Sequence, residues 1–444
     1  MYTDPATRAA AWVGRNDADM TDLNVLDTEL ETVRMANGGD AVGHVDGRVV
    51  FVRGALPGER VRVRIEDRSN DRFWRAVVTD VLDPAPDRVP PACEAAAHGA
   101  GCCDLSFVEP AAARRLKTGV TADVLRRIGP LTDDGLAAAG LFDEGVRALG
   151  PDGEGWRIRT RLFVDDQGRA GVHAWHASTV IVGHHCSAPL AGLVAGLDVE
   201  RFTPGAEIVA VAGADGRHLA EIAPPEPVRG DRGDRRHVQR TRRSRAAARS
   251  TRMLEGAETV PHTVGDRTWD IGVNGFWQAH RAAPATYAAT VVAMMENVDV
   301  DPAGTVAWDL YGGAGIYAGA LLDNAAAQVH VVDSDAGAIS AASTTFAGEA
   351  RLRAHRGEVA ETAVGLPSPD IVVLDPPRTG AGRAVIDMIA AADPRVVVHV
   401  GCDVGRFARD LAFLAERGYR VRALRAFDAF PGTHHVETIA CLTR

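Results

Sequence analysis

The sequence contains almost no lysine: lysine and arginine together number 49, and Lys117 is the only lysine. It also lacks any run of about 18 apolar residues, so we expect no membrane-spanning helix and no membrane partner. Residues 1–22 are mixed and acidic, without the apolar core of a signal peptide. We therefore expect them to form a loose tail on a cytoplasmic protein.

Cysteine is scarce as well. Six cysteines scattered over 444 residues do not suggest a disulfide framework, and metal-binding, catalytic or buried roles are favoured. The net charge of −10 argues against nucleic-acid binding over the whole surface. The charge is uneven, however, because ten arginines fall within residues 229–252. We expect this segment to contact RNA, although a solvated loop without a partner would have the same composition.

The apolar pattern changes along the chain. Short alternating runs divided by turn residues fill residues 23–82, which predicts about five strands in a small barrel of the oligonucleotide-binding kind. A proline-rich linker follows at 83–93. Residues 83–267 are expected to form a central α+β domain that contains clustered cysteines, a helix over 107–129 and the arginine-rich segment.

From residue 268 to 444, apolar strand-like runs alternate with alanine-rich helical stretches. Regular strand–helix alternation predicts a doubly wound α/β domain whose sheet is largely parallel. In such a sheet, ligands bind beyond the carboxyl ends of the strands. The residues at those ends are therefore the first candidates for a functional site.

Three of these strand ends carry ligand-binding features. The first runs Asp309-Leu-Tyr-Gly-Gly-Ala-Gly315, where small residues allow a tight turn close to a ligand. The second ends at Asp333, whose carboxylate can hold both hydroxyls of a ribose. The third ends at Asp375, before two prolines. A tight turn alone would give the first pattern, but the absence of G-x-G-x-x-G favours a ligand without phosphates.

A fourth strand, RVVVHVG, ends just before Cys402 and a helix. A helix N-terminus lowers the pKa of a thiol, so Cys402 is a candidate nucleophile. A small buried cysteine is the alternative interpretation. Cys441, inside the apolar run TIACL, is expected to be such a core residue.

Taken in order, these segments resemble the bacterial RNA uracil-5-methyltransferases, specifically the ribosomal-RNA type with an N-terminal TRAM domain. The resemblance extends from about residue 24 to 444, and seven segments in the expected order make it specific. It implies a TRAM barrel, a central domain and a Rossmann-like class I methyltransferase domain. The matching segments are DAVGHVDGRVVFVRGALPGERV, GVNGFWQAH, DLYGGAG, HVVDSD, DPPRTG, GCDVGRFARDL and PGTHHVET.

The resemblance implies S-adenosylmethionine as the cofactor. The cofactor contacts carry over to Gln278, Tyr311, Asp333 and Asp375. The turn residues Gly313 and Gly315 are expected to let the cofactor approach the backbone closely. The substrate contacts carry over to Phe276, which matches a ring beside the target base, and to Arg378 and His435.

The resemblance also implies a covalent mechanism. A thiolate at Cys402 adds to carbon 6 of the uracil, and Glu437 removes the proton from carbon 5 after methylation. This chain has Gly401-Cys402-Asp403-Val404 where the family commonly has Ser-Cys-Asn-Pro. The missing proline and amide leave open how the loop is held and how readily the thiol ionises.

Four cysteines match the position of a 4Fe–4S cluster that the ribosomal-RNA branch often holds: Cys93, Cys102, Cys103 and Cys186. Their spacing departs from the family's. Eight residues separate the first two, the next is adjacent, and Ala100 occupies the expected middle position. Zinc bound with His98 and the absence of any metal both remain open alternatives.

The resemblance therefore implies a monomeric enzyme that methylates carbon 5 of a uridine in RNA, with 23S ribosomal RNA favoured by the TRAM domain and the extra cysteines. Arg48, Arg53 and Arg60 around the barrel strands are further RNA-binding candidates. Transfer RNA as substrate is one alternative. A non-catalytic RNA-binding protein with a degenerate methyltransferase domain is another. An amino-group methyltransferase is less favoured, because such enzymes need no cysteine–glutamate pair.

Overall fold

The computed structural model describes all residues except 1–26, 151–152, 154, 225–248, 297–303 and 325. The expected N-terminal tail and most of the arginine-rich segment thus lie outside the described residues. The chain folds into two compact units. The first unit comprises residues 1–92, 103–153 and 282–444, and the second comprises 93–102 and 154–281.

The limits of these units differ from the domain boundaries that we expected at residues 83 and 268. Residues 103–153 group with the C-terminal part of the chain, because strand β6 (Val146–Ala148) pairs with its sheet. Residues 268–281 group with the second unit, in which β14 (Arg267–Gly272) pairs with β13 (Thr259–Val264). Boundaries drawn along the sequence cannot detect a segment that returns to another part of the fold.

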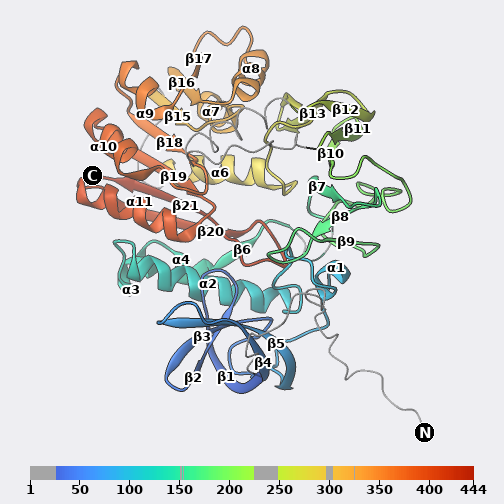
Figure 1. Ribbon diagram of the computed structural model, residues 1–444. Coiled ribbons are helices and arrows are strands. Elements are labelled where there is room, and N and C mark those ends of the chain that lie inside the picture. The colour runs from blue at the N-terminus through green and yellow to red at the C-terminus, as the bar shows by residue number, and fades with distance from the viewer. Residues whose placement is uncertain (1–26, 151–152, 154, 225–248, 297–303, 325) are drawn as a thin grey trace, which may run out of the picture. The chain divides into compact units, whose positions relative to one another are not determined.

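A closed barrel forms the N-terminal part of the first unit (Figure 1), in the order β1-β2-β3-β5-β4. Its strands alternate buried and exposed residues, and valines such as Val50, Val52, Val61 and Val63 fill the interior. The barrel expected from the sequence is therefore confirmed. Its strands are β1 (Asp27–Met35), β2 (Ala41–Val45), β3 (Arg48–Arg53), β4 (Arg60–Asp67) and β5 (Phe73–Asp83).

An eight-stranded sheet forms the rest of the first unit, in the order β17-β16-β15-β18-β19-β21-β20-β6. Strands β15 to β19 are parallel, while β21 runs antiparallel to both β19 and β20. The expected doubly wound α/β domain is therefore confirmed, with an antiparallel C-terminal strand. Its strands are β15 (Val306–Leu310), β16 (Gln328–Asp333), β17 (Leu352–Arg356), β18 (Ile371–Leu374), β19 (Val396–Gly401), β20 (Arg420–Asp428) and β21 (Glu437–Thr443).

Every residue of the central strands β18 and β19 is buried, because helices cover both faces of this sheet. Helix α2 begins with Pro110, and the Glu109 carboxylate caps it by accepting two backbone N–H groups. None of the described helices combines the length and apolar character needed to cross a membrane. The helices are α2 (Pro110–Arg127), α3 (Asp133–Ala138), α4 (Leu141–Glu144), α6 (Ala283–Glu296), α7 (Ile316–Asp323), α8 (Ala336–Thr345), α9 (Val359–Thr362), α10 (Gly382–Ala392) and α11 (Val404–Glu416), with a 3₁₀ turn at Ala363–Gly365.

The second unit contains a six-stranded antiparallel sheet in the order β12-β11-β10-β7-β8-β9 and the hairpin β13–β14. Val209, Val211 and Ala220 are buried on one side of the central strands, and Ile208, Ala210 and Leu219 on the other. Its further elements are α1 (Glu94–Ala97), β7 (Arg159–Val164), β8 (Ala170–His173), β9 (Val180–Val182), β10 (Glu207–Gly213), β11 (Gly216–Ile222) and β12 (Thr251–Glu255).

Candidate active site

Four neighbouring parallel strands of the first unit end at residues that the sequence marked as functional. Strands β16, β15, β18 and β19 lie side by side, so their carboxyl ends meet at one edge of the sheet. Asp333 ends β16, Tyr311 follows β15, Asp375 directly follows β18 and Cys402 follows β19. The fold thus gathers residues from four separate motifs.

The turn after β15 has the backbone conformation that its glycines suggested. Gly313 and Gly315 have φ angles of 54° and 83°, and Tyr311 has a φ of 57°. The left-handed region costs a residue with a side chain about 1–3 kcal/mol, so the surroundings hold Tyr311 in it. The Asp333 carboxylate accepts the Gly313 N–H at 2.9 Å. A ligand on this turn would therefore meet backbone N–H groups beside a carboxylate.

Asp375 is the second carboxylate at this edge. The hydroxyl of Tyr317, from α7, donates to its Oδ2 atom at 3.3 Å. Burial raises the pKa of Asp375 to about 6, with His399 and the Tyr317 hydrogen bond acting in the opposite direction. Asp375 is therefore mostly ionised at neutral pH, and it can accept hydrogen bonds from a ligand.

Cys402 and Glu437 lie at the ends of adjacent antiparallel strands. The β19–β21 ladder pairs Gly401 with Thr438, and the Thr438 hydroxyl donates to the Gly401 carbonyl at 2.9 Å. One step further in the same register lie Cys402 and Glu437. Backbone pairing, rather than a flexible loop, thus brings the thiol and the carboxyl to one place.

The altered loop around the cysteine is accounted for by helix capping. Asp403 is the N-cap of α11, and its carboxylate accepts the Arg406 N–H at 2.9 Å. An aspartate caps a helix as well as an asparagine does. Val404 takes the first helical position, where proline is favoured in general but not required, and it is buried.

The protonation of the thiol differs from the sequence-based expectation. We expected the helix N-terminus to lower its pKa. Burial, together with the nearby carboxyls of Glu437 and Asp375, instead raises the pKa of Cys402 to about 12. Burial likewise raises the pKa of Glu437 well above its usual value. Burial therefore opposes the ionisation of both groups before substrate binds.

Arg378 is the cation that opposes these shifts. Its charge lowers the pKa of both Cys402 and Glu437. The side chain is exposed at the end of the Asp375-Pro-Pro-Arg378 turn. His435 also lies near it, and burial lowers the pKa of His435 to about 4, so this imidazole is neutral. The site therefore combines one cation, one neutral imidazole and the thiol–carboxyl pair.

Tyr287 is a site residue that the sequence did not reveal. It lies on α6, which packs against β21, and its ring contacts Phe427 with centroids 5.7 Å apart. Its hydroxyl is buried without a hydrogen-bond partner among the described residues. Burial raises its pKa well above 10, and Glu437 and Cys402 add to that shift. No motif surrounds Tyr287 in the alanine-rich helix, so only the fold places it here.

A buried imidazole–carboxylate pair joins the segments that follow β18 and β19, and it was also not predicted. His399 Nε2 lies 3.1 Å from Asp410 Oδ2, inside the layer between β19 and α11. The same carboxylate accepts the N–H groups of Ala381 and Gly382 at 2.7 and 3.0 Å. Asp410 therefore ties the segment after Arg378 to the helix that follows Cys402.

Two predicted site residues belong to the second unit. Phe276 and Gln278 lie in the loop after β14. The Phe276 ring is 76% exposed, whereas Gln278 is half-buried. Between them, Trp277 is buried and stacks on His262, with ring centroids 4.7 Å apart. This buried anchor fixes the loop and leaves the Phe276 ring available for contact with another molecule.

The cysteines of the cysteine-rich region have unequal surroundings. Within the second unit, the sulfur atoms of Cys93 and Cys186 lie within 4.8 Å of one another. Cys102 is exposed and does not belong to this group. Cys103, the next residue in the chain, is buried. The two adjacent cysteines are therefore not equivalent as metal ligands.

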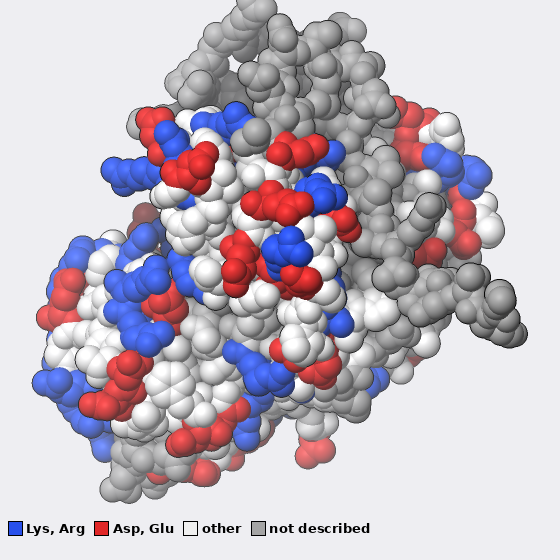
Figure 2. Space-filling model, turned by 90° about the horizontal axis from the view of Figure 1, so that it is seen from below, with Lys and Arg blue, Asp and Glu red and all other residues white. Residues whose placement is uncertain are grey.

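The barrel arginines differ in their availability. Arg53 is buried, which disfavours direct RNA contact. Arg60 is exposed and forms ion pairs with Glu29 and Asp83, and RNA contact by Arg60 stays a prediction. Arg48 and Arg68 both lie over the Trp74 ring at 5.1 Å. Figure 2 shows basic and acidic side chains interspersed over the described part of the face that it presents. Local arginine–aromatic groups are therefore the stronger candidates for RNA contact.

Comparison with known families identifies both ends of the chain. Residues 25–78 match the TRAM domain, and they coincide with most of the barrel. Residues 358–444 match the family described as tRNA (uracil-5-)-methyltransferase. The second match includes the strand ends that carry Asp375, Cys402 and Glu437.

Similar proteins cover nearly the whole chain. An uncharacterized RNA methyltransferase of Corynebacterium glutamicum is 42% identical over 94% of this chain and 96% of its own length. The 23S rRNA (uracil(1939)-C(5))-methyltransferase of Halomonas elongata is 29% identical over 93% and 89%. The Pyrococcus abyssi tRNA (uracil-54, C5)-methyltransferase, solved with S-adenosyl-L-homocysteine, superposes with a TM-score of 0.64 at 18% identity over 93% and 99%. The chain therefore belongs to the RNA methyltransferases that combine a TRAM domain with a (uracil-5-)-methyltransferase domain.

Proposed function

We propose that this protein transfers a methyl group from S-adenosylmethionine to carbon 5 of a uridine in RNA through a covalent adduct with Cys402. The observation that carries the proposal is the pairing of Cys402 and Glu437 at the ends of β19 and β21, next to Asp375. A nucleophile and a base side by side are what this substitution requires. A degenerate, purely RNA-binding domain would have no use for a buried thiol and a buried carboxyl at the same strand ends.

The proposed reaction begins when the Cys402 thiol loses its proton to solvent and the resulting thiolate forms a bond to carbon 6. The electrons of the carbon 5–carbon 6 double bond move toward the carbon 4 carbonyl, and the resulting enolate makes carbon 5 nucleophilic. S-adenosylmethionine, when bound, supplies the methyl group, and its sulfur keeps the electron pair of the broken bond. Glu437 then takes the proton from carbon 5. The electrons of that bond restore the double bond and expel Cys402 as a thiolate.

The residues that would hold S-adenosylmethionine lie at the strand ends beside the thiol. The turn with Gly313 and Gly315 offers backbone N–H groups, and Asp333 and Asp375 offer carboxylates for the hydroxyl and amino groups of the cofactor. Tyr311, which follows the first strand directly, supplies an aromatic ring. We propose Gln278 as a further contact on the basis of its motif. This donor set suits a ligand without phosphates.

We propose ribosomal RNA as the substrate and transfer RNA as the alternative. The TRAM domain and the ribosomal-RNA methyltransferase among the relatives favour the first. The relative with a solved structure, a transfer-RNA enzyme, leaves the second open. Mapping 5-methyluridine in ribosomal and transfer RNA, with and without the gene, distinguishes them. Loss of a methylated position from one RNA class identifies the substrate.

An iron–sulfur cluster is a second proposed cofactor. The closeness of Cys93 and Cys186 supports these two thiolates as ligands. Cys102 fits less well, because it is exposed and lies outside their group. Iron and sulfide analysis of anaerobically purified protein tests this proposal, and zinc without sulfide would identify the alternative metal.

RNA that carries 5-fluorouridine tests the covalent mechanism. Fluorine on carbon 5 cannot leave as a proton does, so the adduct formed by Cys402 stays intact. We expect a stable protein–RNA complex that requires the cofactor, and peptide mapping should place the link on Cys402. Full methylation activity on ordinary RNA without any trapped complex would contradict the mechanism.

A further inference from the structure

The connection between β20 and β21 leads directly into the proposed base. Strand β20 ends at Asp428, β21 begins at Glu437, and Phe427 pairs with Glu437 across the ladder. Residues 429–436 belong to neither strand, so the ladder does not hold them. Side chains from residues 104–117, which include the first turns of α2, hold this connection at two points.

The only lysine of the chain holds the first point. Lys117 is 3% exposed, and its Nζ donates to Asp428 Oδ1 at 2.6 Å and to the Phe430 carbonyl at 3.5 Å. A buried ion pair adds little net stability, because both charges lose their hydration, but removing one partner is costly. The ammonium is a compact point charge, whereas a guanidinium is a broad planar fork. At this buried position the point charge contacts one carboxylate oxygen and one carbonyl.

Asp104 holds the second point. Its Oδ1 accepts the His434 N–H at 3.0 Å, and its Oδ2 pairs with His434 Nδ1. The Asp104 side chain is only 7% exposed. Next to it, the Leu105 N–H donates to the Gly432 carbonyl at 2.9 Å. Three hydrogen bonds thus fix the connection just before His435 and Glu437.

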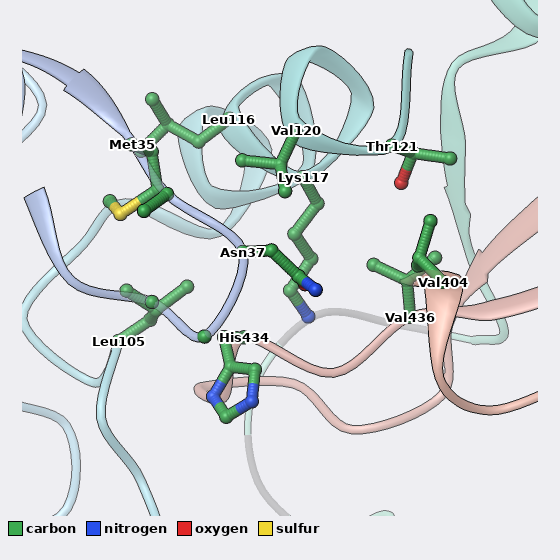
Figure 3. A pocket seen from close by; sticks show the side chains of 13 residues that line it. Met35, Asn37, Leu105, Leu116, Lys117, Val120, Thr121, Val404, His434 and Val436 are labelled. Atoms are coloured by element: carbon green, nitrogen blue, oxygen red, sulfur yellow. The ribbon is translucent and has the colours of Figure 1, made fainter. Parts of the chain in front are cut away.

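A turn of the barrel covers these contacts. Gly39 has a φ of 86°, and a Cβ added to it would lie 2.9 Å from both Asp104 Oδ2 and the His434 Cβ. The backbone can approach the pair this closely only because glycine stands there. A small pocket lies beside these contacts, and Lys117, Asn37, Val436 and His434 are among the residues that line it. Figure 3 shows Lys117 extending from α2 toward this pocket. The barrel turn therefore packs on the residues that hold the connection.

We infer that Lys117 and Asp104 are positioning residues for the Glu437 carboxyl. They hold Asp428, Phe430 and His434 through their side chains, and so fix the backbone that enters β21 at Glu437. The inference rests on the proposed function, in which Glu437 acts last. A misplaced base leaves the earlier steps intact and stops the enzyme while it is still joined to RNA. General loss of structure would instead slow every step together.

The test uses Asp104→Asn and the double variant Lys117→Met/Asp428→Asn in the full-length protein. Each is incubated with S-adenosylmethionine and ordinary RNA from cells that lack the gene, from whichever class the parent methylates. We expect kcat to fall about 10- to 100-fold, as for a group displaced by about 1 Å, while KM for RNA changes little. On a denaturing gel, a covalent protein–RNA complex should accumulate above the parent's level. Lower kcat without such accumulation, or unchanged kcat in both variants, would overturn the inference.

Two further variants distinguish a loss of positioning from general damage to α2 and from failure of the proposed function. Arg126→Met removes an exposed ion pair of the same helix, between Arg126 and Asp133, and it should keep the parent's kcat. Glu437→Gln should itself accumulate the complex, and its failure to do so counts against the proposed function. Accumulation with Glu437→Gln but not with Asp104→Asn overturns the positioning role alone. If the double variant does not fold, the result with Asp104→Asn alone tests the positioning role. This variant should fold, because asparagine keeps the side-chain shape and one acceptor oxygen.

Discussion

Cys402 directly follows Gly401, and Glu437 directly precedes Thr438, the partner of Gly401 across the β19–β21 ladder. Their separation is therefore set by the spacing of two strands in one sheet. The antiparallel strand β21 makes this possible, because it brings the start of the last strand beside the end of β19. A purely parallel sheet would have placed Glu437 at the opposite edge.

Removing the thiol should abolish the reaction without disturbing cofactor binding. Cys402→Ala is expected to lower kcat/KM for RNA by roughly a thousandfold or more, since no second nucleophile lies beside it among the described residues. Calorimetric titration with S-adenosylhomocysteine should give an unchanged Kd. Cys441→Ala is the control, because Cys441 is buried in β21 and should affect stability rather than chemistry. Substantial methylation by Cys402→Ala would rule out the proposed nucleophile.

The trapping reaction should accelerate with pH. The pKa of Cys402 is raised to about 12, so only a small fraction of the thiol is ionised at neutral pH and this fraction increases as pH rises. The rate of adduct formation on 5-fluorouridine RNA should therefore climb between about pH 6.5 and 9. Arg378→Gln removes the charge that lowers this pKa, and we expect slower trapping at every pH. A rate that is already level at pH 7 would contradict this assignment.

Tyr287→Phe separates stability from function. The hydroxyl has no partner among the described residues, and an unpaired buried polar group costs about 1–3 kcal/mol. Removing it should leave Tm unchanged or higher. If the hydroxyl donates to bound substrate, kcat should fall about tenfold, the equivalent of one hydrogen bond at about 1.4 kcal/mol. Parent-like kcat together with a higher Tm would mean that Tyr287 has no role in the reaction.

Asp333 should contribute strongly to cofactor affinity. Asp333→Asn weakens hydrogen bonds to a charged acceptor, which are worth about 1.5–3 kcal/mol, so Kd for S-adenosylhomocysteine should rise about 10- to 100-fold. Asp335→Asn is a matched control, because Asp335 caps α8 through the Ala338 N–H. Equal effects of the two substitutions would show that Asp333 has no special contact with the cofactor.

The adjacent cysteines should differ in metal binding. Cys93→Ser and Cys186→Ser are expected to lower bound iron sharply, because their sulfur atoms lie together. Cys102→Ser should retain the parent's iron content, since Cys102 is exposed and lies outside that group. Elemental analysis and the visible absorption of anaerobically purified protein measure both. Loss of iron on changing Cys102 would show that it ligates after all.

Much of the fold followed from local patterns. Alternating apolar residues predicted the barrel, and strand–helix alternation predicted the α/β sheet, because each pattern is imposed by the period of one element. The ends of the parallel strands then indicated where Asp333, Asp375 and Cys402 would meet. The protonation of the thiol was not predictable in this way, because it depends on how completely Cys402 is buried and on which carboxyls surround it.

The sequence alone determined the element types, the motifs and the identity of the nucleophile and base candidates, since these depend on residue type and short-range spacing. Only the tertiary structure brought Lys117 to Asp428, Asp104 to His434 and Tyr287 to Phe427. Those contacts join residues far apart in the chain, and no local period records them. Packing likewise decided that Cys103 is buried while Cys102 is exposed, although the two residues are neighbours in the sequence.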